Sequence, residues 1–150
     1  MSAAPSAAPS AAPSAAIPRT EAGPQVAIST AADPVLVAGR RAFFTYRDLG
    51  VSGASAGRMR AQLTVAKDGM TEATGWHVHL CEGQFVYMLS GWVELEFADR
   101  KVRLQAGDSA YIPGHTPHNE VGASANFELL EISVPAEMGT RPCDPPPGLG

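Results

Sequence analysis

The sequence predicts an all-β domain, either a barrel or a sandwich. Short runs rich in β-branched and aromatic residues alternate with turn signals, and no segment of useful length repeats its apolar residues with helical spacing. The runs predict strands over residues 42–46, 58–66, 75–80, 84–90, 92–98, 101–105, 108–113 and 126–134.

Turn residues and alternating polarity support these strands. The sequence "ADRK" after Phe97 predicts a hairpin, and Gly107 in "AGD" is typical of a second tight turn. In the strand 58–66, Arg60, Gln62 and Thr64 share one face because alternate residues of a strand point to the same side. This polar face is expected to meet water or a ligand.

Both ends of the chain differ in composition from the middle. Residues 2–16 repeat Ser-Ala-Ala-Pro, in which proline recurs too often for a helix and no bulky side chain can join a core. Scattered prolines and glycines continue beyond the repeat, so residues 1–34 are predicted to form a disordered arm and linker. Residues 141–150, "RPCDPPPGLG", are predicted to form a proline-rich tail. The folded domain is therefore expected over residues 35–140, a normal size for one domain.

Overall composition excludes several classes of partner. The 150 residues are 45% hydrophobic and 17% charged, with a formal net charge of −4. This charge provides no basic field, so we expect neither nucleic acid nor a membrane surface as a partner. No apolar run approaches the roughly 20 residues of a membrane-spanning helix, and the N-terminus lacks the features of a secretory signal. The two cysteines, Cys81 and Cys143, lie far apart in sequence, and we expect a cytoplasmic protein with free thiols.

The four histidines occur in two short groups. His77 and His79 form "HVH", and His115 and His118 form "HTPH". Two residues apart on a strand, His77 and His79 can direct their rings at one point. Imidazole is a ligand for divalent transition metals, here Fe, Zn, Ni, Mn or Cu, and a site that does chemistry generally needs three or four protein ligands. The sequence therefore predicts a metal site that includes this pair.

The spacing around the histidines resembles that of the cupin superfamily. The first cupin motif has His-x-His, three or four residues, Glu, six residues and Gly, and the matching positions here are His77, His79, Gln84 and Gly91. The second motif is matched by Gly107, Pro113 and His118, whereas His115 replaces the usual second glycine and Gly122 stands where asparagine is expected. The resemblance covers about residues 43–135 and favours Gln84 over Glu82 as the fourth ligand.

This resemblance implies a double-stranded β-helix with a metal held by His77, His79, Gln84 and His118. The ligand spacing is similar to that of cupins that open the ring of unsaturated uronates in pectin breakdown, which carry an aspartate at a place similar to Glu131. It is also similar to that of other single-domain cupins, and this second resemblance implies no particular activity. A homodimer is expected from the resemblance alone.

The donor set suggests the chemistry. Three neutral imidazoles and an amide leave a divalent metal its full double positive charge, so the site is expected to act as a strong Lewis acid on an oxygen-rich small molecule. Glu131 is the candidate acid or base if it faces inward, and an outward, solvated glutamate is the alternative. Tyr46, Arg60 and Gln62 are candidates to bind the substrate, and for each of them a solvated face is the alternative.

Three functions stay open at this point. The first is isomerase, lyase or hydrolytic chemistry, and the second is iron-dependent dioxygenation. The third is a module that binds or senses a metal or ligand without turnover. A roomy polar cavity with an inward Glu131 would favour an enzyme, and a barrel packed shut with apolar side chains would favour the binding module.

Overall fold

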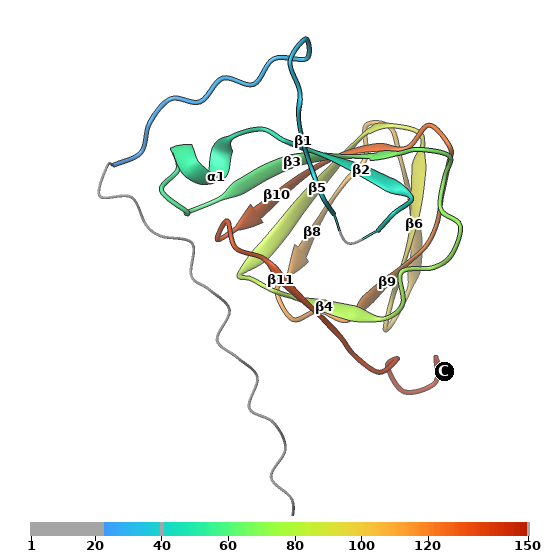
Figure 1. The fold of residues 1–150 in the computed structure, drawn as a ribbon. Coiled ribbons are helices and arrows are strands. Elements are labelled where there is room, and N and C mark those ends of the chain that lie inside the picture. Colours follow the sequence, from blue (N-terminus) through green and yellow to red (C-terminus); the bar gives the residue numbers. More distant parts are fainter. Residues whose placement is uncertain (1–22, 40, 150) are drawn as a thin grey trace, which may run out of the picture.

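The computed structural model describes residues 23–39 and 41–149, which form a pair of antiparallel sheets that face one another (Figure 1). The first sheet has the order β1 (Val35–Val37), β2 (Phe44–Asp48), β3 (Arg60–Ala66), β10 (Glu128–Val134), β5 (Gly83–Ser90) and β8 (Ser109–Pro113). The second has the order β11 (Gly139–Pro142), β4 (His77–Leu80), β9 (His118–Ala123), β6 (Trp92–Phe97) and β7 (Lys101–Gln105). A single helical turn, α1 (Val51–Ala54), precedes β3. The predicted all-β double-stranded β-helix is confirmed.

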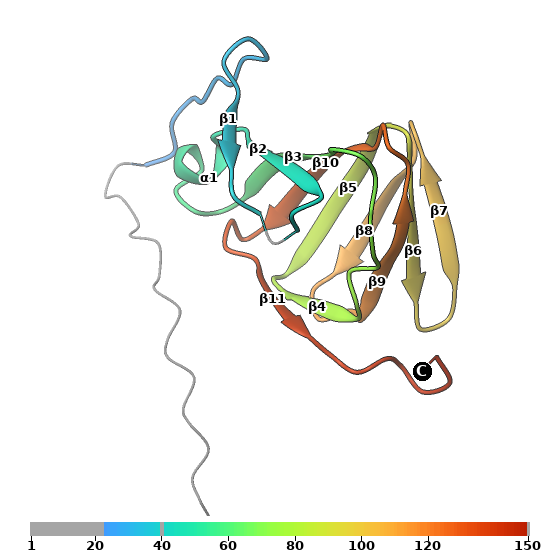
Figure 2. The ribbon, with the colours of Figure 1, turned by 45° about the vertical axis from the view of Figure 1, so that its right-hand side comes forward.

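Figure 2 shows β6, β7 and β9 standing opposite β5, β8 and β10, with β4 and β11 at one end. Each sheet therefore has one face toward the other sheet and one face outward. Strand β10 pairs with both β3 and β5, and its Glu131 lies beside Gln62 on one side and Val86 on the other. Directly paired residues share a face of a sheet, so these three side chains all point between the sheets.

Apolar side chains fill one region of the space between the sheets. Phe44, Val86, Met88, Val93, Phe127 and Leu129 form a buried cluster. The rings of Phe44 and Phe127 stack with their centroids 5.3 Å apart, and Met88 has no exposed surface. Burial of these side chains is the main favourable contribution to the stability of the barrel.

Most predicted strands are present, with ends shifted by a few residues. The hairpin at "ADRK" is also present, since the Phe97 amide donates to the Arg100 carbonyl at 2.7 Å. Three strands were not predicted, namely β1, β9 and β11. Strand β9, "HNEVGA", lacks a run of strand-forming residues and is extended because it pairs with β6 along its length and with β4 at His118.

The predicted domain boundaries differ in one place. Residues 1–22 of the predicted arm lie outside the described residues, and residues 23–34 contain no helix or strand and are exposed. Strand β1 begins at Val35, where the domain was predicted to begin. The predicted start of the tail, residue 141, falls inside β11, because Arg141 and Pro142 continue the pairing with β4. No helix among the described residues is long and apolar enough to cross a membrane.

Candidate metal centre

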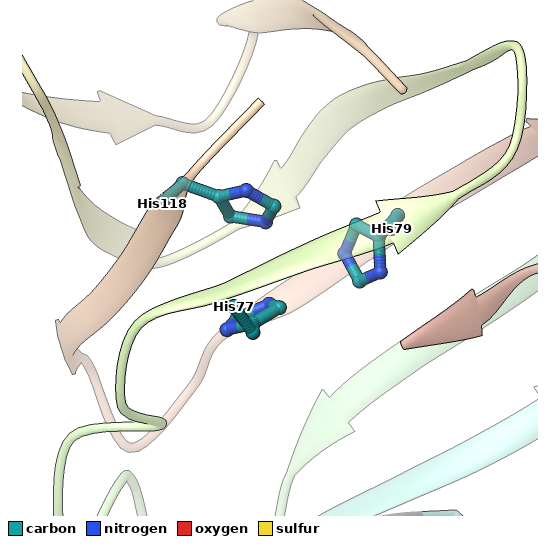
Figure 3. Close-up of side chains that lie close together, drawn as sticks. All are labelled: His77, His79 and His118. Carbon is teal, nitrogen blue, oxygen red and sulfur yellow. The ribbon is translucent and has the colours of Figure 1, made fainter. Parts of the chain in front are cut away.

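Three histidines meet between the sheets near the end formed by β4 and β9. His77 and His79 come from β4, and His118 comes from β9 beside it (Figure 3). All three are buried, and one ring nitrogen of each lies within 4.8 Å of those of the other two. The strand alternation of β4 and the pairing of His77 with His118 explain this convergence.

Hydrogen bonds to Nδ1 fix the orientation of each ring. The Nδ1 atoms of His77 and His118 lie 2.8 Å from the carbonyl oxygens of Gly75 and Thr116. A carbonyl oxygen can only accept, so Nδ1 carries the proton in both rings, and in the neutral ring Nε2 keeps its lone pair. Nε2 of His118 is buried and has no hydrogen-bond partner among the described residues.

The ring of His79 is held in a different way. Its Nδ1 atom lies 2.8 Å from the hydroxyl of Thr140 on β11. Strand β11, which was not predicted from the sequence, therefore positions the candidate ligand His79. A partner of this kind on the second ring nitrogen is usual for histidines that bind metals.

Gln84 of β5 is buried and lines one cavity together with His77 and His79. Its Nε2 atom donates to Oε2 of Glu131 at 2.8 Å, since a carboxylate only accepts. The Oε1 atom is consequently turned away from Glu131, and it is buried without a hydrogen-bond partner in the described structure. An amide oxygen and an imidazole nitrogen that accept no hydrogen bond can each give an electron pair to a divalent transition metal. Gln84 and His118 therefore fit the metal that the family resemblance implies.

Glu131 lies under this site and receives three donors. Arg60 donates to its Oε1 atom at 2.8 Å, Gln62 donates to the same oxygen at 3.0 Å, and Gln84 donates to Oε2. Glu131 is only 9% exposed, so it takes the inward alternative of the two considered for it. Buried carboxylates need such partners, because an unpaired buried charge is costly.

A cavity of about 480 Å³ opens above these residues. Its wall includes the three side chains expected to bind substrate, Tyr46, Arg60 and Gln62, together with Gln84 and Glu131. The Nε atom of Arg60 is buried and has no acceptor within the described residues. Polar side chains such as Arg41, Thr64 and Thr74 also line the cavity. The apolar part of the wall is formed by Phe44, Val86, Val93, Leu95, Ile112, Phe127, Leu129 and Met138.

Sequence reasoning missed one carboxylate at the site, that of Glu120. Its oxygens lie 3.7 Å from Nε2 of His77 and 4.0 Å from Nε2 of His118. Glu120 also lines the cavity, and its side chain is 23% exposed. It follows His118 by two residues on β9, so alternation along that strand would have identified it if the strand had been predicted.

Three other candidates from the sequence lie away from the metal ligands. Glu82 and His115 are exposed, and His115 has a left-handed backbone with φ of 64°, which explains why the family motif has glycine there. Cys81 is buried, and burial together with the nearby Glu131 charge raises the pKa of its thiol. A neutral thiol is a poor metal ligand, so Cys81 is a packing residue. Cys81 and Cys143 are both free, as expected.

Comparison with known proteins agrees with this geometry. A model of the cupin domain matches residues 63–133, which include all four predicted metal ligands. The chain belongs to the cupin superfamily. No curated protein sequence is significantly similar to this cupin.

Several solved structures share its fold. The polyketide cyclase RemF from Streptomyces resistomycificus is 21% identical, with a TM-score of 0.64, over 80% of this cupin and 87% of that chain. KdgF from Halomonas sp. is 21% identical, with a TM-score of 0.56, over 70% of this cupin and 89% of that chain. An RmlC-like cupin from Shewanella frigidimarina is 20% identical, with a TM-score of 0.56, over 73% of this cupin and 91% of that chain. At these identities the likeness shows a common fold.

Proposed function

We propose that this cupin is a metal-dependent enzyme that binds one divalent transition metal through His77, His79, His118 and Gln84. Its substrate is a small molecule with an oxygen group at the metal and an apolar body. The preferred chemistry is Lewis-acid isomerisation, elimination or hydrolysis, with Glu131 as the acid or base.

The observation that carries this proposal is the three-histidine group together with two buried acceptor atoms that have no hydrogen-bond partner in the described structure. Buried polar atoms in native proteins nearly always have a hydrogen-bond partner, so each exception requires an explanation. Nε2 of His118 and Oε1 of Gln84 are two such exceptions. His118 is grouped with His77 and His79, and Gln84 lines the cavity together with these two histidines. A bound metal would supply the missing partner for both.

The cavity supports a substrate with two chemically different ends. Its floor is polar, with Arg60, Gln62, Gln84 and Glu131, whereas aromatic and aliphatic side chains form much of its wall. A volume of about 480 Å³ lies within the usual range for small-molecule sites. A sugar acid that carries hydroxyl groups all round would leave the apolar wall poorly matched, so we favour a hydroxylated or enolisable ketone on an aromatic or alkyl body.

The residues around Glu131 support a role in proton transfer. A carboxylate has about four lone-pair sites, and the three donors from Arg60, Gln62 and Gln84 leave one for a substrate hydroxyl or C–H proton. Arg60 lines the cavity, so its guanidinium can bind a substrate oxygen. The bound metal would supply polarisation of that oxygen or of a water molecule.

Two alternatives remain as outcomes of the test. Iron with oxygen uptake would indicate a dioxygenase, and a metal without turnover would indicate a binding or sensing module. The open cavity and the inward carboxylate favour an enzyme over that module.

Elemental analysis of protein purified with and without oxygen tests the metal site. We expect one equivalent of a divalent metal in the wild type and loss of that metal in His77→Ala/His79→Ala. The matched control is His115→Asn, which changes the exposed fourth histidine to a residue that tolerates its left-handed backbone. Unchanged metal content in the double variant would refute the site.

Turnover of a substrate panel tests the chemistry. The panel compares ketones and phenols of increasing apolar size with sugar acids, and oxygen consumption is recorded in parallel. We expect oxygen-independent turnover of the compounds with an apolar body. Turnover of the sugar acids alone would contradict the proposed substrate class.

A further inference from the structure

The carboxylate of Glu120 lies at the edge of the histidine cluster, on the same strand face as His118. Neither the family motif nor the ligand spacing of the sequence includes this residue. We propose that Glu120 is a further ligand of the metal and supplies the negative charge that Gln84 lacks. This inference rests on the metal site of the proposed function.

The distances from Glu120 to two of the three histidines fit shared coordination. Metal–nitrogen bonds are about 2.0–2.1 Å and metal–oxygen bonds about 2.0–2.2 Å, so two donors on one metal lie about 3.0–4.2 Å apart. The two Glu120 oxygens are 3.7 Å from Nε2 of His77 and 4.0 Å from Nε2 of His118. Each distance lies within that range, and each involves the nitrogen that the Nδ1 hydrogen bonds leave as the acceptor of its ring.

Thr74 fixes the carboxylate in this place. Its hydroxyl donates to Oε2 of Glu120 and accepts from the Glu120 amide at 3.0 Å, and the Thr74 amide donates to the Glu120 carbonyl at 2.9 Å. Ligating carboxylates are typically held by a second hydrogen bond of this kind. Thr74 therefore acts as a positioning residue for Glu120.

Burial indicates the same role. Glu120 lines the cavity beside His77, and its side chain is only 23% exposed. A partly buried carboxylate that faces neutral imidazoles needs a compensating positive charge, and a divalent metal between them would provide it.

Ligation by Glu120 changes the electrostatics of the site. The ligand spacing of the sequence predicts three imidazoles and an amide, which leave the metal its double positive charge. A carboxylate ligand reduces this to a single positive charge and weakens the Lewis acid. The charge missing at Gln84, where the family motif has glutamate, is then restored from another strand.

The test compares Glu120→Gln with wild type in the full chain. Gln keeps the shape of the side chain and removes its charge, and the matched control is Glu82→Gln, an exposed change in the turn before β5. Zinc affinity is measured by chelator competition, and coordination is measured from the visible absorption of the Co²⁺ form. Removal of a residue that only supports a ligand costs about 10–100-fold in affinity.

We expect Glu120→Gln to lower zinc affinity by more than about 100-fold and to change the Co²⁺ spectrum, and Glu82→Gln to do neither. A smaller loss with an unchanged Co²⁺ spectrum would overturn the inference, since Glu120 would then act only through hydrogen bonds. If wild type itself fails to bind metal, the proposed function fails as well. Metal binding by wild type therefore distinguishes failure of the Glu120 inference from failure of the proposed function.

A second measurement, on wild type, tests the inference even if Glu120→Gln does not fold. Coordination shifts the carboxylate stretching bands in the infrared difference spectrum of wild type with and without Zn²⁺. Glu131→Gln, which lacks the other cavity carboxylate, should retain that shift when Zn²⁺ is raised enough to saturate this more weakly binding variant. Loss of the shift in Glu131→Gln, or its absence in wild type, would overturn the assignment to Glu120.

Discussion

Gln84 and Glu131 form a pair in which each residue determines what the other can do. An amide can present either its oxygen or its nitrogen, and the Glu131 carboxylate accepts only from nitrogen, so the Gln84 oxygen is turned away from Glu131. Glu131 thus orients the side chain that we propose as the fourth metal ligand, and it also lines the cavity. This explains how a glutamine can replace the acid of the family motif without losing a defined geometry.

Replacement of Glu131 by glutamine should therefore affect metal binding as well as turnover. In Glu131→Gln the new amide can donate to the Gln84 oxygen. Gln84 can then turn this oxygen toward residue 131 and away from the proposed metal. We expect zinc affinity to fall by about 10–100-fold and turnover to fall by about 10²–10⁴-fold. Chelator competition and steady-state kinetics measure the two effects.

The control is Glu128→Gln on the same strand, at a position where the side chain lies outside the site. It should leave both quantities near the wild-type values. Equal metal affinity in Glu131→Gln and wild type would show that Glu131 does not orient Gln84.

At the scale of elements, the turn that joins β5 to β6 connects the two sheets and depends on one glycine. Gly91 has φ of 68°, and a Cβ there would overlap the Ser124 hydroxyl and lie 2.9 Å from Cα of Phe127. The backbone after β9 therefore packs directly on this turn. Because β5 carries Gln84 and β9 carries His118, the turn also contributes to the spacing of the site.

Substitution of two glycines separates backbone strain from this close packing. Gly107 also has positive φ, but a Cβ there would meet nothing within 4 Å. We expect Gly107→Ala to lower the free energy of unfolding by about 1–2 kcal/mol. Gly91→Ala should lower it by about 1–3 kcal/mol more, because the added methyl overpacks the turn. Urea unfolding measures both, and equal losses would show that the overlap is relieved at little cost.

At the scale of the whole molecule, the outward face of the six-stranded sheet is unusually apolar. Phe85 and Tyr87 of β5, Tyr111 of β8 and Val134 of β10 are 38%, 39%, 64% and 39% exposed. They lie on neighbouring strands, and Phe85 pairs directly with Tyr111. Contiguous exposed apolar side chains of this kind are typical of an interface between subunits.

The expected homodimer stays a prediction, and this face is where we expect the second copy to bind. Tyr87→Glu should convert a dimer to a monomer, because a charge would be buried at the interface without a partner. Analytical ultracentrifugation measures the change. Gln105→Glu, which adds the same charge to an exposed position of β7, is the control. A wild-type monomer, or a Tyr87→Glu dimer, would contradict the predicted interface.

The sequence alone determined the fold class and half of the site. Strand alternation and turn residues are local properties, so they sufficed to place His77 and His79 on one side of a strand and to predict the turn at Gly107. The family motif added His118, which lies with the pair, and Gln84, whose role as a ligand stays a prediction. Location, substrate and metal identity stay predictions.

Only the tertiary structure decided how Glu131 and Glu120 relate to that site. Glu131 meets Arg60, Gln62 and Gln84 across sequence separations of 71, 69 and 47 residues, and no local pattern encodes such contacts. Glu120 lies on β9, whose weak local preference for a strand is overridden by its pairing with β6. Residue spacing specifies which way neighbouring side chains point, whereas the packing of two sheets specifies which of those side chains meet.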